Sequence, residues 1–410
     1  MWVWQQPDWP GNQPDTAQPF RYNSLELAPL LRELHFLQGL LLGKTGATEN
    51  PQLALDTLLA NILTSSAIEG ERLNHSLVRS SLARKLGIAE PENAPTTLSS
   101  AIEGERLNHS LVRSSLARKL GIAEPENAPT TLQSEGLAAM LYDAIGNWAD
   151  PLSLERLLQW HAWLFPPVES LTNKVVGGQL RGGEPMQVVS GRIEKPKVHF
   201  EAPPRSVLEA QLQQFIGWFN QSAGQTELDP LLRAGIAHFW FITLHPMEDG
   251  NGRLARLLTD LALAQAEHQS IRCYAMSVAI LQKRSSYYDI LEQSQKGDTD
   301  ITAWLLWFLE TLKSSLQQAL ADIDLTLQKT RFWQRADQSQ LSKEQVKVLN
   351  RLLDGDFADG ISSSQYEKVA KVSRATATRH LAQLVTLGYM VKTDAGGRST
   401  RYKVAAEAKT

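Results

Sequence analysis

The 410-residue sequence predicts a mainly α-helical protein with one β-hairpin and a small C-terminal domain of different character. Three observations support this fold class. Leucines recur at helical spacing through most of residues 24–330. One stretch, 177–204, replaces that spacing with short valine-rich runs that are typical of strands. From about residue 337, three short helical patterns are followed by two strand-like runs.

The first twenty residues differ from the helical body that follows them. Trp2, Trp4 and Trp9 stand among three prolines, which excludes a regular helix there. We expect the tryptophans to pack this segment onto the helical body rather than to stack on a cofactor. In that body, the leucines of 254–261 lie on one face of a helix.

The strand-like stretch predicts a β-hairpin. Val188 and Val189 form one short run, residues 198–200 form a second, and Gly191 and Pro196 lie between them. A lone hairpin in a helical protein has unpaired edges. Such an edge is a liability unless a partner strand uses it.

The C-terminal region has its own pattern. A Ser-x-x-Gln capping box predicts a helix over 342–353, and helices over 362–371 and 373–387 follow. Residues 389–391 and 401–404 are typical of strands around a Gly-Gly pair. This order resembles a winged helix-turn-helix domain.

Composition sets limits on location and partners. The hydrophobic share of 42% and the charged share of 21% are ordinary for a globular protein. A net charge of −3 creates no global field toward nucleic acid or membrane. The single cysteine, Cys273, excludes an internal disulfide and fits a reducing compartment. No secretory start and no apolar run of about 20 residues is present, so a cytoplasmic location without a membrane span is expected.

An internal repeat interrupts the helical region. Residues 65–98 recur letter for letter as residues 99–132. The period of 34 matches tetratricopeptide units, but two copies without their aromatic and small-residue pattern argue against a solenoid. Complete identity indicates a recent duplication or an artefact of assembly. A domain built for one copy must extrude the other or stack it as an extra helical pair.

The chemistry-bearing motif is HPMEDGNGRLAR, residues 245–256. It follows an apolar helix and opens the next one, so free backbone N–H groups and the positive helix end form an anion site. Gly250 and Gly252 allow the backbone to approach a phosphate closely. Arg253 and Arg256 lie off the leucine stripe of their helix and can reach the same pocket.

Two further side chains complete the motif. Asp249 offers the single carboxylate that Mg²⁺ needs when substrate phosphates supply its other oxygens. His245 is the side chain best suited to accept a hydroxyl proton near neutral pH.

In this spacing the motif resembles the signature of the Fic/Doc family, H-x-F-x-[DE]-G-N-G-R-x-x-R. The resemblance implies a Fic-type helical bundle and a protein adenylyltransferase, which moves AMP from ATP to a Ser, Thr or Tyr hydroxyl of a protein target. It implies His245 as the general base and Asp249 as the Mg²⁺ ligand. Around the phosphates of ATP it places Gly250, Asn251, Gly252, Arg253 and, on the γ-phosphate, Arg256.

Other segments resemble the same family. The family's phenylalanine is Met247 here, a residue expected to pack inward. Related Doc kinases lack this Gly-Asn-Gly loop, so the resemblance favours AMP transfer. Residues 284–288 resemble an R-x-x-Y-Y segment near the nucleoside, which makes Tyr287 and Tyr288 nucleotide contacts unless they only pack between helices. The hairpin around Val188 and Val189 resembles the target-docking flap, and the N-terminal segment WVWQQPDWP resembles a module found ahead of some bacterial Fic domains.

A brake is also implied. SSAIEG resembles the family's inhibitory motif [ST]-x-x-x-E-[GN], which Ser65 and Glu69 satisfy in the first copy and Ser99 and Glu103 in the second. We favour Glu69, because it continues the apolar stripe of its helix and a carboxylate there needs a cationic partner. Arg256 is the candidate partner.

Together these features predict a self-inhibited AMP transferase with ATP as donor and Mg²⁺ as cofactor. Removal of AMP, another nucleotide donor, and a nucleotide-sensing DNA-binding regulator stay as alternatives. DNA contact through residues 362–404 competes with a protein-interaction role for the basic C-terminal region, and association of two copies is left open. The expected domains are an N-terminal helical module with the brake and the duplication, a catalytic domain, a linker helix and a winged helix, over 1–140, 141–309, 310–338 and 339–405.

Overall fold

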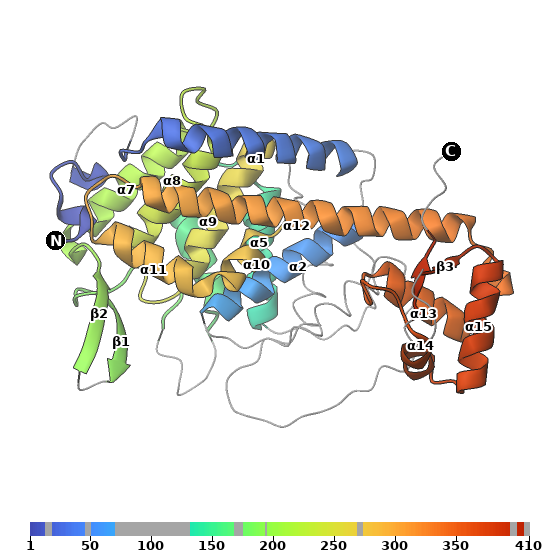
Figure 1. Cartoon of the computed structure of the whole chain (residues 1–410). Helices are drawn as coiled ribbons and strands as arrows, with labels where there is room; N and C mark the ends of the chain where they lie inside the picture. Colours follow the sequence, from blue (N-terminus) through green and yellow to red (C-terminus); the bar gives the residue numbers. More distant parts are fainter. Residues whose placement is uncertain are drawn as a thin grey trace. The chain divides into compact units, whose positions relative to one another are not determined.

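The structure is a computed structural model that describes residues 1–12, 19–45, 51–69, 132–167, 175–192, 195–268, 274–393 and 400–405. The described residues are mainly helical, which confirms the predicted fold class. They divide into two compact units, one up to Gln317 and one from Gln318 onward (Figure 1). Most of the duplicated segment, including Ser99 and Glu103, lies outside the described residues.

The first unit is a helical body with a hairpin at one end (Figure 1). Two short 3₁₀ helices, η1 (Val3–Gln5) and η2 (Pro10–Asn12), precede its α-helices. These are α1 (Ser24–Thr45), α2 (Pro51–Ile68), α5 (Leu132–Gly146), α6 (Leu154–Leu164), α7 (Arg205–Gln221), α8 (Pro230–Leu244), α9 (Asn251–Glu267), α10 (Met276–Gln282), α11 (Arg284–Gln295) and α12 (Thr302–Arg335). The part of α12 from Gln318 onward belongs to the second unit. The linker helix expected over 310–338 falls within α12 up to Arg335.

The core is built around α8. Asp229 caps its first turn by accepting a hydrogen bond from the Leu231 N–H at 2.9 Å, with Pro230 at the first helical position. Every residue of Leu231–Leu244 is buried. A helix that is apolar on all sides belongs in the centre of a bundle, and α8 therefore gives the motif that follows it a rigid support.

The N-terminal tryptophans pack onto this body, as predicted. Trp9 is fully buried and meets Phe20 and Trp240 edge to face, with ring centroids 5.5 and 6.4 Å apart. The Trp4 indole donates to the carbonyl of Glu201 at 2.7 Å. The segment thus joins α8 to the end of the hairpin.

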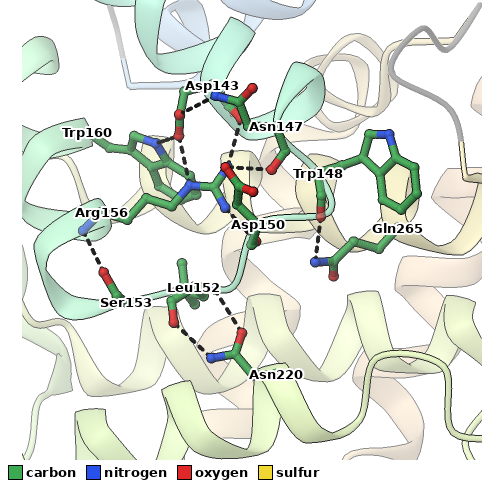
Figure 2. A network of polar contacts seen from close by, with 10 residues as sticks. All are labelled: Asp143, Asn147, Trp148, Asp150, Leu152, Ser153, Arg156, Trp160, Asn220 and Gln265. Atoms are coloured by element: carbon green, nitrogen blue, oxygen red, sulfur yellow. Dashed lines mark hydrogen bonds and ion pairs between the residues drawn. The ribbon is translucent and has the colours of Figure 1, made fainter.

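A polar network fixes the connection between α5 and α6 (Figure 2). The Arg156 Nε donates to Asp143 Oδ2 at 2.8 Å, and the Trp160 indole donates to the same oxygen at 2.7 Å. Arg156 also donates to the Asp143, Asn147 and Asp150 carbonyls. Burial raises the pKa of the Asp143 carboxyl, but the hydrogen bonds from Arg156, Asn147 and Trp160 outweigh it and hold that pKa below its usual range.

We expect the Arg156→Ala change to lower the free energy of unfolding by about 3 kcal/mol, because it leaves a largely buried carboxylate without its cation. Equilibrium urea unfolding at neutral pH measures this. Glu209→Ala, which removes a surface pair with Arg205 whose glutamate is 66% exposed, is the control and should cost about 0.5 kcal/mol or less. Equal losses in the two variants would contradict the buried role of the Arg156 network.

The predicted hairpin is present as β1 (Gln187–Arg192) and β2 (Lys195–Glu201). Its strands are longer than the sequence pattern indicated, because Gly191 and Pro196, expected between them, pair with each other inside the ladder. A proline is tolerated there since each strand has one free edge in a two-stranded sheet. The exposed fractions of Val188 and Val189 are 37% and 51%.

The second unit follows the predicted order. The helices α13 (Lys343–Leu353), α14 (Ser363–Ala370) and α15 (Arg374–Thr386) precede the strands β3 (Met390–Lys392) and β4 (Tyr402–Val404), which pair antiparallel. The Ser342–Gln345 capping box is formed as expected. A separate core, which includes Val348, Tyr366 and Leu381, joins these helices.

Candidate active site

His245 lies immediately after the buried helix α8. Its backbone is left-handed, with φ of 48°, and its N–H donates to the Phe241 carbonyl at 3.1 Å to end the helix. A residue with a side chain in this region costs of order 1 kcal/mol, which rigid surroundings must offset.

The imidazole has a defined protonation pattern. Its Nδ1 lies 3.1 Å from the Ile242 carbonyl oxygen, which can only accept, so Nδ1 carries the proton and Nε2 keeps its lone pair. Burial lowers the pKa of His245 to about 4, although the Ile242 carbonyl and nearby carboxylates act against the shift. At neutral pH the ring is therefore an uncharged base.

Arg181, which the sequence reading missed, holds the segment after α8 in place. Its Nε donates to the His245 carbonyl at 2.9 Å, its backbone N–H to the Pro246 carbonyl at 3.0 Å, and its Nη2 to the Pro203 carbonyl at 2.5 Å. The side chain is 3% exposed. Arg181 thus ties the histidine to the chain leaving the hairpin. Arg181 stands alone in a glycine-rich loop and belongs to no helical or strand pattern, so the sequence did not indicate that it would hold the histidine.

The loop after His245 is closed by its own residues. The Asn251 side chain accepts from the Met247 N–H and donates to the Met247 carbonyl, both at 2.9 Å. Met247 is fully buried, as predicted. Asn251 therefore shapes the loop with its side-chain amide. Gly250 has φ of 80°, where a side chain would be strained and a Cβ would overlap Leu164.

The N-terminus of α9 faces an anion supplied by the chain itself. A Cβ at Gly252 would overlap Glu69 Oε1, so the Glu69 carboxylate lies against the first turn of this helix. The Arg256 Nη2 donates to Glu69 Oε1 at 2.7 Å, and its Nε donates to Ser65 Oγ at 2.8 Å. Serine and glutamate of the first duplicated copy thus meet the last arginine of the motif.

The pair is ionised. Burial raises the pKa of Glu69, but Arg256, with Arg253 and Arg284 farther away, outweighs it and keeps the pKa below the ordinary range. Arg256 is 2% exposed, whereas 31% of the Glu69 side chain remains exposed. The carboxylate therefore lies at the edge of a buried cationic site that is open to the solvent on one side.

Comparison with known proteins matches two parts of the chain to family models. The model of the Fic/DOC family matches residues 151–263, which contain α6, the hairpin, α8, the motif and most of α9. Residues 151–263 are a Fic domain. A second model, described as a domain of unknown function (DUF4172), matches residues 2–88 and 94–122. The first matched stretch ends within the first duplicated copy (65–98), and most of the second stretch lies in the second copy (99–132).

Curated relatives align with part of this chain. Protein adenylyltransferase fic-1 of Caenorhabditis elegans is 29% identical over 153 residues, which cover 36% of this chain and 25% of the relative. Protein adenylyltransferase Fic of Culex quinquefasciatus is 32% identical over 166 residues, 39% of this chain and 28% of the relative. The chain thus spans about a quarter of the length of these relatives.

One solved structure shares the fold over nearly the whole chain. A Fic family protein from Desulfovibrio desulfuricans covers 96% of this chain and 100% of its own, with a TM-score of 0.50 and 18% identity. This likeness supports the helical architecture around the Fic domain and says nothing of its substrate.

The two tyrosines expected near the nucleoside differ in their surroundings. Tyr287 is 1% exposed and its hydroxyl lies 2.9 Å from His238 Nε2, so it packs in the core of the Fic domain's neighbouring helices. Tyr288 is 38% exposed, and its hydroxyl donates to the Ile68 carbonyl at 3.2 Å. Arg284 donates to the same carbonyl at 2.6 Å. Tyr288 and Arg284 therefore hold the C-terminal end of α2, which Glu69 directly follows.

Asp249 is a carboxylate of the motif that could hold a magnesium ion whose other oxygen ligands come from substrate phosphates. Asp249 is exposed, and its Oδ1 accepts from the Gly250 N–H at 2.5 Å. Within the described ranges, no cluster of three or more His, Cys, Asp or Glu residues could hold a metal. One carboxylate beside a phosphate site is the arrangement that Mg²⁺ uses with nucleotides.

No helix of the described part of the chain is long and apolar enough to cross a membrane.

Proposed function

We propose that the chain is a protein adenylyltransferase that moves AMP from ATP to a Ser, Thr or Tyr hydroxyl of a protein target. The observation that carries the proposal is the uncharged His245 imidazole, fixed by Ile242, next to a glycine-rich helix start where Arg256 holds an anion. The curated names of the relatives support the same activity.

The chemistry follows from the positions of these groups. His245 Nε2 accepts the proton of the target hydroxyl, whose oxygen attacks the α-phosphorus as pyrophosphate leaves. The backbone N–H groups at the start of α9, with Arg253, stabilise charge on the phosphates. Asp249 would hold Mg²⁺, which supplies charge neutralisation when bound. Val188 and Val189, at a free edge of the hairpin, would pair with an extended segment of the target.

Glu69 acts as the brake in this proposal. A γ-phosphate needs the guanidinium of Arg256 and the helix start that the carboxylate already contacts. Two anions cannot share this site, so the nucleotide binds productively after Glu69 has moved. The exposed side of the carboxylate provides the route by which it leaves.

Two isotopic forms of ATP test the activity. The Glu69→Gly protein, incubated with Mg²⁺ and α-labelled ATP, should become labelled, whereas γ-labelled ATP should leave it unlabelled. Transfer of the γ-label would indicate a kinase instead. Binding of ATP with no transfer of either label would favour a nucleotide sensor.

The lowered pKa of His245 predicts the pH dependence. A base must be deprotonated to act, and burial moves its pKa from the ordinary 6.5 to about 4. We therefore expect kcat/KM of the Glu69→Gly protein to stay level from about pH 7 down to about pH 5.5. An acid limb centred near the ordinary histidine pKa would contradict the buried position of this ring.

For the second unit we propose contact with DNA through α15. Arg374 and Arg379 are exposed on this helix, as is Lys392 on β3. Arg401 is not available, because it donates to the Gly360 carbonyl at 2.9 Å. Retention of the full chain on duplex DNA should fall with salt, and the Arg374→Ala/Arg379→Ala variant should lower the salt slope by about 2. Arg32→Ala, which removes an exposed arginine of α1 in the first unit, is the control. If retention on DNA depended neither on the salt concentration nor on Arg374 and Arg379, the second unit would instead be a protein-interaction domain.

A further inference from the structure

Two side chains of the hairpin and one of α11 form a line of polar groups that the transfer reaction does not use. Ser190 Oγ of β1 lies 2.6 Å from His199 Nε2 of β2, and His199 Nδ1 lies 2.5 Å from Glu292 Oε2 of α11. A hydroxyl, an imidazole and a carboxylate in this order, at these distances, are the arrangement that activates a serine. Three separate elements contribute the three groups.

A β-bulge brings the imidazole into the line. Val188 opposes Phe200 and Val189 opposes Val198, so His199 is the additional residue of β2 without a cross-strand partner in the ladder. Bulges redirect side chains and occur beside functional sites. Here the bulge lets one ring contact both the neighbouring strand and a helix outside the sheet.

The direction of the hydrogen bonds follows from the carboxylate. Hydrogen bonds from Lys296 and then from His199 lower the pKa of Glu292 to about 2, so its carboxylate only accepts. His199 Nδ1 therefore donates to Glu292, and in the neutral ring Nε2 accepts the proton of the Ser190 hydroxyl. The serine oxygen has its lone pairs free for attack.

The surroundings indicate the kind of electrophile. Lys197 is directly opposite Ser190 in the ladder and is exposed. Side chains of directly opposed residues lie on one face, with Cβ atoms about 5 Å apart. An ammonium group at that position stabilises negative charge that develops on the oxygens of a phosphoryl centre under attack.

We propose that Ser190 is a covalent modification site, a reactive hydroxyl that accepts a phosphoryl group from an activated phosphorus(V) ester or anhydride. The Oγ–P bond forms while the bond from phosphorus to the leaving group breaks. The hydroxyl proton passes to His199 Nε2, and Glu292 stabilises the imidazolium. The site uses neither His245 nor Arg256, so it does not depend on the proposed AMP transfer.

A fluorophosphonate probe tests the site in the full chain, with peptide mass spectrometry to locate and time the label. Fluoride is the leaving group. We expect labelling of Ser190, no label at that position in Ser190→Ala, a rate lower by about 10²-fold in His199→Ala and His199→Gln, and a smaller loss of about tenfold in Glu292→Gln. The glutamine at 199 keeps a polar side chain, which separates loss of the base from loss of the hairpin.

Two further variants complete the design. Ser285, whose Oγ lies 3.4 Å from the Asp289 carboxylate, is a serine beside a carboxylate, and Ser285→Ala should leave the labelling rate of Ser190 unchanged. His245→Ala should also leave it unchanged, which separates this result from the transfer reaction. Labelling of Ser190 no faster than that of Ser285, or labelling of both position-199 variants at the parent rate, would overturn the proposal.

Discussion

The Glu69→Gly variant is expected to incorporate about 10- to 100-fold more α-label from ATP than the parent chain. Glu69 Oε1 contacts Arg256 at 2.7 Å, so an incoming γ-phosphate must first break this ion pair. A partly exposed pair of this kind is worth about 1.4–2.8 kcal/mol, and each 1.4 kcal/mol changes an equilibrium about tenfold. Label incorporated per mole of protein, with ATP and Mg²⁺ held constant, measures the effect.

The duplicated segment supplies a matched control. Glu103 stands in the same local sequence as Glu69, 34 residues later. We expect Glu103→Gly to label at the parent level, because the Arg256 site is already occupied by the first copy. Glu69→Gln keeps the shape of the side chain without its charge and should label nearly as well as Glu69→Gly. Stimulation by Glu103→Gly alone would assign the brake to the second copy.

His245→Ala, made in the Glu69→Gly protein, should reduce AMP transfer by about 10²- to 10⁴-fold, the usual contribution of a general base. The ring is neutral and held by Ile242, and alanine leaves no group to accept the hydroxyl proton. Binding of ATP should change little, since the phosphates meet α9 rather than the imidazole. Single-turnover labelling with a separate measurement of ATP affinity distinguishes the two steps.

The control for this change is another histidine in the same backbone conformation. His268 ends α9 with φ of 50°, just as His245 ends α8, but it lies at the end of α9 opposite to the motif. His268→Ala should therefore retain the labelling rate. If both alanine variants lost activity equally, helix termination rather than proton transfer would explain the effect.

Much of the fold was predictable because its signals are local. Helical leucine spacing, the capping box at Ser342 and the valine runs of the hairpin each reflect contacts within a few residues of the chain. The inward packing of Met247 was also predicted, from the resemblance to the Fic/Doc motif, in which a phenylalanine takes this position and methionine can fill the same space. The strand ends were less predictable, because Gly191 and Pro196 pair in the ladder although their types favour a turn.

The candidate site was predictable only in part. The motif places His245, Gly250 and Arg256 along one short stretch of chain, so their proximity follows from sequence. Arg181 and the His199–Glu292 contact follow from no spacing, since each joins segments many residues apart. The surroundings of Tyr287 follow from no spacing either, since its hydroxyl lies beside His238 and interacts with Arg256.

The sequence by itself determined the helical class, the anion-binding turn and the type of group that performs each task, because these depend on residue chemistry and short-range geometry. Two identical segments carry identical local information, so the sequence favoured Glu69 only through the residues that precede it, and the tertiary structure places Glu69 against Arg256. It also decided the charge of His245. Burial by surrounding helices lowers that pKa, and no single segment of the chain specifies how much water the others exclude.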